Sequence, residues 1–326
     1  MIAALGLSAA DSLAYVFAVE PFEGVWWASL TLRAGQFAIP AVGLVIGFVG
    51  LADRLRALQD EIESNFAAEH ERAAREAGRA EREQLRGQIQ RLAAGSGLSM
   101  ALQPIVDLAS GRIVGAEALA RFTGADGQAI ATEDCFLDAH ALDLGADLEL
   151  AAVRLALAEH ERLPEGLYLA LNCSPALLSS PELLEMLVAH GPRPLVVELT
   201  EHQQVEDYFA LARALDELRA HGVRVAIDDV GSGFSSFRHV TRVNPEILKL
   251  DRSLVCGIHD DPVRQSLAAA IVAFAADVGA VVVSEGIESE AELDCLRELA
   301  VGMGQGFFLG RPNLGPLEAR FPERVG

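Results

Sequence analysis

From Leu98 onward, the chain shows short apolar runs, most of which are followed by stretches of helical periodicity. The runs read LSMALQPIVDL, RIVGAEALARF, LYLALN, PLVVELTE, VRVAIDDV, EILKLD, AVVVSEG and the segment around GMGQGFF. Strands that alternate with helices favour a mainly parallel sheet. About eight such units in roughly 230 residues predict an α/β fold of the (β/α)8 TIM-barrel type. A doubly wound open sheet is the alternative, but no GxGxxG loop opens the first helix.

The first part of the chain has a different pattern. Residues 34–52 read AGQFAIPAVGLVIGFVGLA and contain no charge. A helix of this length matches the roughly 30 Å hydrocarbon core of a bilayer, and Arg54 and Arg56 follow it as expected on a cytoplasmic side. We therefore predict a transmembrane helix, with a buried helix of a soluble protein as the alternative. Residues 2–19 form a candidate second span, although Asp11 would cost about 3 kcal/mol within it.

A polar, proline-free stretch from residue 53 to about residue 94 predicts one long helix, and the sequence AGSG at 94–97 predicts its end. Apolar residues fall at three- and four-residue spacing near both of its ends, at Leu55, Leu58, Ile62, Leu85, Ile89 and Leu92. This spacing is that of a partial coiled-coil seam, and a solvated spacer is the alternative. We thus divide the chain into membrane-anchoring residues 1–52, a helical linker over 53–95 and a barrel domain over 96–326.

Composition limits the partners. The formal net charge is −21, from 47 acidic and 26 basic residues. Such a surface repels a nucleic-acid polymer, whereas a small anionic ligand remains compatible if metal ions or a few arginines reverse the local field. The four cysteines are scattered and form no CxxC pair, which suits a reducing compartment and argues against a disulfide framework or a zinc cluster.

Polar residues recur at the carboxyl ends of the apolar runs. They are Glu117, Asn172, Glu198, Asp228, Asp229, Lys249 and Glu285, and Gln305 lies just past the last run. One such acid alone is more often a helix cap or a partner for a surface cation. A barrel gathers its strand ends on one face, where active sites lie, so the recurrence predicts a single site.

The side chains gathered at these strand ends indicate which kind of ligand the site could bind. Several carboxylates and an amide, without cysteine or histidine, are hard oxygen ligands of the kind that Mg2+ or Mn2+ prefers. The adjacent pair Asp228 and Asp229 allows two neighbouring ions to be held. A two-metal site clamps the attacking and leaving oxygens of a phosphoryl displacement, and Lys249 would add positive charge for the phosphate.

Residues 117–121 read EALAR, and further motifs accompany this string in order. They are QPI at 103–105, NCS at 172–174, ELTE at 198–201, DDVGSGFSS at 228–236, KLD at 249–251, EGIE at 285–288 and QGFFLGRP at 305–312. With these motifs, residues 98–320 resemble the EAL domain of cyclic di-GMP phosphodiesterases. The resemblance departs at Val230 and Phe234, where the family more often has Phe and Tyr.

The resemblance implies roles for individual residues. The metal ligands would be Glu117, Asn172, Glu198 and Asp228 for one ion and Asp229 for the second. The catalytic set would be Lys249 beside the attacking water, Glu285, which helps to hold the metal site or that water, and Glu117. Substrate would contact Gln103, Arg121 and Gln305. A regulatory loop that couples dimer contacts to metal occupancy would include Glu201, Gly231, Ser232, Gly233 and Glu288.

The resemblance also implies an activity, cofactors and partners. We expect hydrolysis of cyclic di-GMP to linear pGpG with two Mg2+ or Mn2+ ions, in a homodimer formed through the EAL domain and the helical linker. The protein would sit in a bacterial inner membrane with its catalytic domain in the cytoplasm. A catalytically inactive cyclic di-GMP receptor is the alternative, and a barrel hydrolase for another phosphodiester is a third reading.

Overall fold

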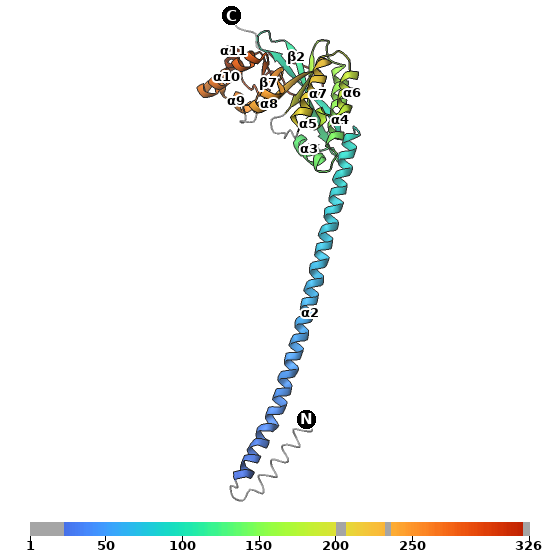
Figure 1. The fold of residues 1–326 in the computed structure, drawn as a ribbon, viewed down its shortest axis with the longest axis vertical. Coiled ribbons are helices and arrows are strands. Elements are labelled where there is room, and N and C mark those ends of the chain that lie inside the picture. The colour runs from blue at the N-terminus through green and yellow to red at the C-terminus, as the bar shows by residue number, and fades with distance from the viewer. Residues whose placement is uncertain (1–22, 200–206, 232–235, 322–326) are drawn as a thin grey trace. The chain divides into compact units, whose positions relative to one another are not determined.

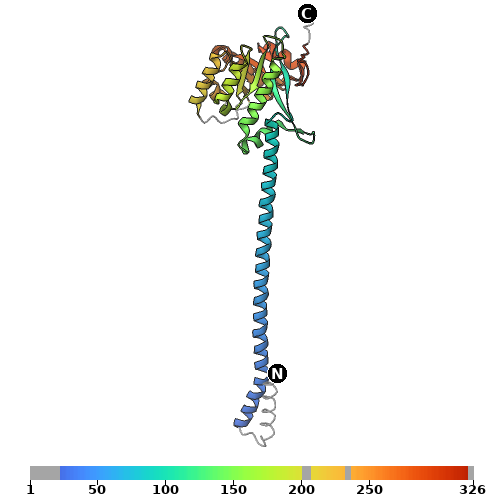
Figure 2. The same cartoon turned by 90° about the vertical axis from the view of Figure 1, so that its right-hand side faces the viewer.

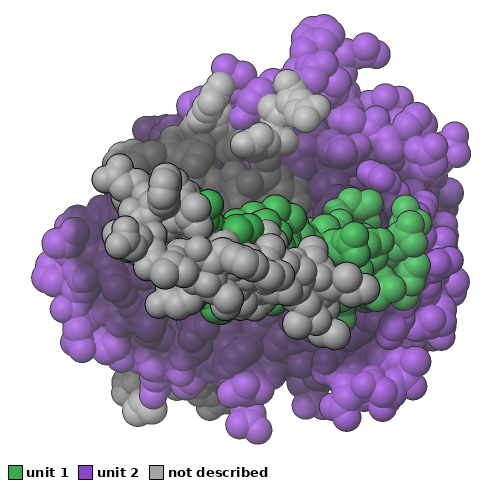
Figure 3. Space-filling model, turned by 90° about the horizontal axis from the view of Figure 1, so that it is seen from below, with its two compact units in different colours: residues 1–81 green, residues 82–326 purple. Residues whose placement is uncertain are grey.

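The structure is a computed structural model that describes residues 23–199, 207–231 and 236–321. The chain divides into two compact units, residues 1–81 and residues 82–326, which Figure 3 shows in green and purple. The candidate second span at residues 2–19 lies outside the described residues.

Helix α2 runs without interruption over Glu23–Ala93. It includes both the predicted membrane segment and most of the predicted linker, so the boundary at residue 52 is one of composition alone. Large apolar side chains in the uncharged segment are exposed, for example Phe37 at 72% and Leu44 at 78%. By its length and composition alone, this helix could cross a membrane. It ends at Ala93, as the glycines that follow predict.

The second unit contains a closed barrel. Its sheet order is β1-β9-β8-β7-β6-β5-β4-β2-β3, and pairing of β1 with β2 closes it, with the short β3 appended. The strands are β1 (Leu98–Asp107), β2 (Ile113–Thr123), β3 (Ala129–Ile130), β4 (Tyr168–Asn172), β5 (Leu195–Leu199), β6 (Arg224–Val230), β7 (Ile247–Leu250), β8 (Val281–Ser284) and β9 (Met303–Gly304). The predicted eight-stranded barrel with surrounding helices is thus confirmed.

One strand departs from the regular (β/α)8 pattern. β1 is antiparallel to both β2 and β9, whereas β2, β4, β5, β6, β7, β8 and β9 are parallel in sequence around the barrel. The chain turns from β1 to β2 within a few residues, where Asp107 accepts hydrogen bonds from Ser110 and Gly111 has a φ of 73°. A hairpin this tight leaves no room for a crossover helix, and it therefore reverses β1.

Helices surround the barrel (Figures 1 and 2). They are α3 (Thr132–Ala141), α4 (Gly145–His160), α5 (Pro175–Leu178), α6 (Pro181–Ala189), α7 (Tyr208–Ala220), α8 (Ser236–Val243), α9 (Arg252–Val255), the 3-10 helix η1 (Ile258–Asp260), α10 (Pro262–Val278) and α11 (Glu290–Glu298). Several begin at side-chain caps. Asp207 caps α7, and Ser289 forms a capping box with Glu292 at α11, which satisfies backbone N–H groups that a helix start leaves unpaired.

Three groups of buried side chains hold this unit together. The largest fills the layer between strands and helices. A second lies inside the barrel, and we call it the barrel floor: Ile105, Tyr168, Ala170, Val196, Ala226, Ile247, Val283 and Met303. The third joins the end of α2 to the barrel domain. There Ile89 and Leu92 pack with Phe122 and Leu148, so these two residues of the predicted seam contact the barrel domain. Leu55, at 58% exposure, belongs to the part of the seam that stays exposed.

Candidate active site

The polar side chains of the candidate site lie next to the barrel floor, toward the carboxyl ends of the parallel strands. Residues two apart on a strand share a face. Val196 belongs to the floor, so Glu198 faces the same interior, and Ile247 places Lys249 there in the same way. We call this group the polar layer: Glu117, Asn172, Glu198, Asp228, Lys249, Glu285 and Gln305. It occupies the end of the barrel that carries active sites in such folds.

Lys249 lies at the centre of the polar layer, with 1% of its surface exposed. It is the only lysine in the chain. Its Nζ lies 2.6 Å from Glu285 Oε1 and 2.7 Å from Glu198 Oε2. Asp228 Oδ1 lies 3.3 Å away and Glu117 Oε2 3.5 Å away. One ammonium group thus faces four carboxylates from different parts of the barrel.

This crowding shifts the protonation of the layer. Burial alone would lower the pKa of Lys249, but the four surrounding carboxylates outweigh it and hold that pKa well above its usual range. Burial and the neighbouring carboxylates raise the pKa of Glu285 to about 8, despite the attraction of Lys249. Burial raises the pKa of Glu198 as well. The layer therefore holds protons near neutral pH, which bound cations would displace.

Two amides hold Glu117. Asn172 Nδ2 donates to Glu117 Oε1 over 2.9 Å, and Gln305 Nε2 donates to Glu117 Oε2 over 2.7 Å. Burial would raise the pKa of Glu117, but Lys249 and these hydrogen bonds outweigh it, and the pKa is lowered. Gln305 Oε1 is buried and has no hydrogen-bond partner among the described residues. Such an acceptor is normally satisfied by a bound water or cation.

A backbone irregularity presents the two adjacent aspartates. Pairing between β6 and β7 shifts between Ile227 and Val230, and Asp229 has a φ of 58°, in the left-handed region that non-glycine residues rarely adopt. Bulges of this kind redirect side chains near active sites. Asp228, Asp229 and Glu285 each offer a carboxylate oxygen, and these atoms lie within 4.8 Å of one another. This donor set fits a hard divalent cation such as Mg2+ or Mn2+.

A cavity of about 260 Å3 opens beside the polar layer. It is lined by Gln103, Glu117, Leu119, Asp228, Arg252, Glu285, Gly286, Glu288, Gln305, Gly306 and Phe307. Gln103 Nε2 donates to the Gly310 carbonyl over 3.1 Å, which ties this part of the cavity lining to the chain after β9. Arg121 is exposed and lines a separate cavity of about 230 Å3 that Leu119 and Asn172 also border.

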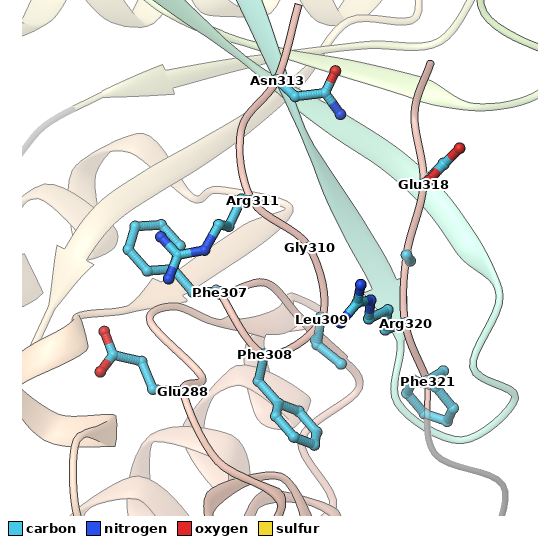
Figure 4. A pocket seen from close by; sticks show the side chains of 11 residues that line it. Glu288, Phe307, Phe308, Leu309, Gly310, Arg311, Asn313, Glu318, Arg320 and Phe321 are labelled. Atoms are coloured by element: carbon cyan, nitrogen blue, oxygen red, sulfur yellow. The ribbon is translucent and has the colours of Figure 1, made fainter. Parts of the chain in front are cut away.

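A larger cavity of about 890 Å3 adjoins the first, and Glu288 and Phe307 line both (Figure 4). The guanidinium of Arg311 lies 4.2 Å from the centre of the Phe307 ring. Arg252 Nη2 lies 2.8 Å from Glu288 Oε1. Sequence reasoning missed Arg252, Phe307 and Arg311. Their positions in the sequence could have indicated them, because Arg252 directly follows the KLD motif, and Phe307 and Arg311 lie within QGFFLGRP.

The structure brings most of the predicted site residues together, with some differences. Glu117 was expected at the end of a strand, but it lies in the middle of β2, because this strand continues to Thr123 opposite β1. Gly231 has a φ of 108°, and Glu288 pairs with Arg252. The remaining predicted loop residues, Glu201, Ser232 and Gly233, lie outside the described residues.

Comparison with known proteins identifies the family. The EAL domain model matches residues 84–312, which is more than half of the chain. The chain belongs to the EAL domain family. An uncharacterized protein of Azorhizobium caulinodans is 32% identical over 255 residues, covering 74% of this chain and 34% of that protein. A probable cyclic di-GMP phosphodiesterase of Escherichia coli, PdeB, is 30% identical over 218 residues, covering 64% of this chain and 41% of PdeB.

Solved EAL structures have the same barrel. Klebsiella pneumoniae BlrP1, in a complex with calcium and cyclic di-GMP, aligns with a TM-score of 0.61 and 30% identity over 69% of this chain and 58% of BlrP1. The EAL domain of Xanthomonas citri FimX, in complex with cyclic di-GMP, aligns with a TM-score of 0.65 and 22% identity over 74% of this chain and 97% of that domain. The FimX likeness shows the fold alone. The chain spans less than half the length of the two curated relatives described above.

Proposed function

We propose that this EAL domain is a metal-dependent phosphodiesterase that hydrolyses cyclic di-GMP to linear pGpG. Water would attack one phosphorus atom, the bond to the 3′ oxygen would break, and that oxygen would take up a proton. The observation that supports this most directly is the polar layer, in which carboxylates that fit divalent cations surround the single buried ammonium of Lys249. The relative PdeB carries the name of a probable cyclic di-GMP phosphodiesterase.

The proposed ligands of one ion are Glu117, Asn172, Glu198 and Asp228, and Asp229 would serve a second. When bound, two Mg2+ or Mn2+ ions would neutralise the phosphoryl oxygens and lower the pKa of the attacking water. Entry of cations would also free Lys249 from part of its ion pairing with the carboxylates.

Lys249 and Glu285 would then act on the reacting groups. The Lys249 ammonium would face the negative charge that develops on the phosphoryl oxygens, and Glu285 would orient the attacking water. Gln103, Arg121 and Gln305 would contact the nucleotide, and a guanine could stack on the face of the Phe307 ring opposite Arg311.

Turnover and binding must be measured separately to test this proposal. The full-length chain in detergent should convert cyclic di-GMP to pGpG with Mg2+ or Mn2+, and fresh chelator should abolish the reaction reversibly. Lys249→Ala should lower kcat by about 10²-fold or more, because it removes a charge that matters most in the transition state, while binding in Ca2+ changes little. Wild-type protein that binds the ligand but releases no pGpG would instead be a receptor. Equal losses in rate and binding would make Lys249 a ground-state phosphate contact.

We also propose that residues 1–52 anchor the protein in a bacterial inner membrane, with the EAL domain in the cytoplasm and a homodimer formed through this domain and the linker. The exposed apolar side chains of α2 support the anchor. Full-length protein should fractionate with membranes, whereas a chain that starts at Arg82, where the second unit begins, should be soluble. Full-length protein that stays in solution without detergent would refute the anchor.

A further inference from the structure

A buried carboxylate outside the polar layer holds the backbone next to Asn172. Glu149, on α4, is 7% exposed, and its Oε2 accepts a hydrogen bond from the Ser174 backbone N–H over 3.0 Å. Ser174 follows Asn172 by two residues and caps α5, because its Oγ accepts from the Leu177 N–H over 3.1 Å. The short segment that leaves β4 is therefore fixed from both sides, by α4 and by the start of α5.

The second oxygen of Glu149 is also engaged. Its Oε1 lies 3.2 Å from Nε2 of His140, near the end of α3. The position of His140 depends on Gly145, because a Cβ at Gly145 would lie 2.2 Å from His140 Nδ1. Glycine thus lets the imidazole lie directly over the first turn of α4. Both carboxylate oxygens of Glu149 have partners, so the side chain is held in one orientation.

The same contacts reach the end of α2. Arg86 donates to the Leu142 carbonyl over 2.9 Å, and Arg82 donates to the Ala141 carbonyl over 3.3 Å. These carbonyls end α3, where arginine side chains satisfy acceptors that the helix leaves unpaired. A continuous series of polar contacts therefore runs from the last turns of α2, through the end of α3, His140 and Glu149, to the segment that carries Asn172.

We infer that Glu149 is a positioning residue, which sets the orientation of Asn172 toward Glu117 and the metal ligands. This inference rests on the proposed function, because Asn172 is a proposed ligand. Asn172 is exposed and donates a side-chain hydrogen bond to Glu117 over 2.9 Å, and the backbone after it is held at Cys173, whose N–H donates to the Glu198 carbonyl over 3.1 Å. Glu149 adds a second restraint, from outside the sheet, at Ser174. Contacts that orient a metal ligand typically contribute about 10–100-fold to metal affinity.

The decisive comparison is between two substitutions at one position, Glu149→Ala and Glu149→Gln, in the full-length chain in detergent. The amide oxygen of glutamine can still accept the Ser174 N–H, and its NH2 group can face His140. We expect Glu149→Ala to raise the dissociation constant for Mn2+ by about 10-fold or more, measured without substrate from the electron paramagnetic resonance signal of free Mn2+. Glu149→Gln should stay within about 3-fold of wild type, which would be rescue by a conservative variant.

Glu246 provides a matched control at the opposite end of the barrel. Its Oε2 accepts the Val225 N–H over 2.8 Å at the start of β6, and its Oε1 lies 2.8 Å from Arg219 Nε. Glu246→Ala should lower the melting temperature and leave Mn2+ affinity unchanged. His140→Ala removes a half-exposed ring, so we expect the chain to stay folded and Mn2+ affinity to weaken by about 3-fold, less than in Glu149→Ala.

The outcomes are separable. Mn2+ affinity that falls equally in Glu149→Ala and Glu246→Ala, or that stays at the wild-type value in Glu149→Ala, would overturn the positioning role, because only general stability would then be at stake. Should Glu149→Ala fail to fold, an unchanged affinity in His140→Ala would overturn it too. Wild-type protein that binds Mn2+ but does not hydrolyse cyclic di-GMP would refute the proposed activity alone, and the ranking of the variants by Mn2+ affinity would still test Glu149.

Discussion

In the barrel, the floor and the polar layer are built from the same strands, two residues apart. On β7 the pair is Ile247 and Lys249, and on β5 it is Val196 and Glu198. Full burial of an aliphatic side chain contributes about 1.5–3 kcal/mol to folding. Burial of several carboxylates around one ammonium costs free energy, because desolvation and mutual repulsion outweigh a single attraction.

This contrast separates stability from activity along each strand. The floor stabilises the barrel, and its one polar side-chain group is the Tyr168 hydroxyl, which lies buried 3.8 Å from Met303 Sδ. The polar layer has charged groups that could act on a phosphate, and burial and neighbouring carboxylates raise the pKa of Glu198 and of Glu285. Substitutions in the polar layer should therefore lower turnover more than stability, and substitutions in the floor should lower stability more than turnover.

The largest effect is expected from Asp228→Asn in the polar layer. The change keeps the shape of the side chain but removes a charged ligand next to Lys249, so turnover should fall by about 10²–10³-fold. Without metal the melting temperature should not fall, because one of the crowded carboxylates is neutralised. Steady-state rates with Mn2+ and thermal unfolding in chelator are the two measurements. A variant that keeps its activity but loses stability would reverse the assignment of the layers.

A floor substitution should show the converse. Ile247 is 2% exposed, and Ile247→Ala leaves a cavity that should cost about 2–5 kcal/mol of unfolding free energy. The kcat of the folded fraction should stay close to that of wild type. Denaturant unfolding measures the loss, with Val263→Ala as control, since Val263 is 77% exposed and should change stability by less than about 0.5 kcal/mol. A large fall in kcat would mean that the two layers are mechanically coupled.

The smallest effect is a pH dependence of stability in the absence of metal. The pKa of Glu285 rises from 4.5 to about 8 on folding, so the folded state binds this proton more tightly than the unfolded chain does. Stability from this group is therefore present at low pH and is lost as pH rises toward about 8. The melting temperature in chelator should fall over that range, and added Mn2+ should raise it most at the alkaline end.

The matched control for this pH dependence is Glu285→Gln, which cannot ionise. Its melting temperature in chelator should vary less with pH than that of wild type, because the ionisable group at residue 285 is gone. Some variation should remain, because Glu198, whose pKa is also raised, is still in the layer. If wild type and variant have the same pH profile, Glu285 is not the group that loses its proton.

The eight strands could be predicted from the sequence because each is a short apolar run bounded by polar residues. The convergence of Glu198, Asp228 and Lys249 could be predicted as well, because a barrel gathers its strand ends on one face. The reversal of β1 was missed, although the turn after Asp107 is too short for a crossover helix and so predicts an antiparallel pair. The central position of Lys249 among four carboxylates could not be predicted, because it depends on contacts with side chains from distant strands. The role that we infer for Glu149 depends on a contact between α4 and the segment after β4, and a lone glutamate on a helix gives no sign of it.

The position of Lys249 has a practical consequence for studies of the protein. Since the chain has no other lysine and this one is buried, reagents that attack amines can reach only the amino terminus of the folded protein. Dyes, cross-linkers or a solid support attached through amines would thus leave the barrel unmodified. Protein grown with lysine that is 15N-labelled at Nζ would give one ammonium resonance, and it would come from the middle of the four carboxylates. A titration of Mg2+ followed on that signal would report directly on whether cations displace the ammonium from its partners.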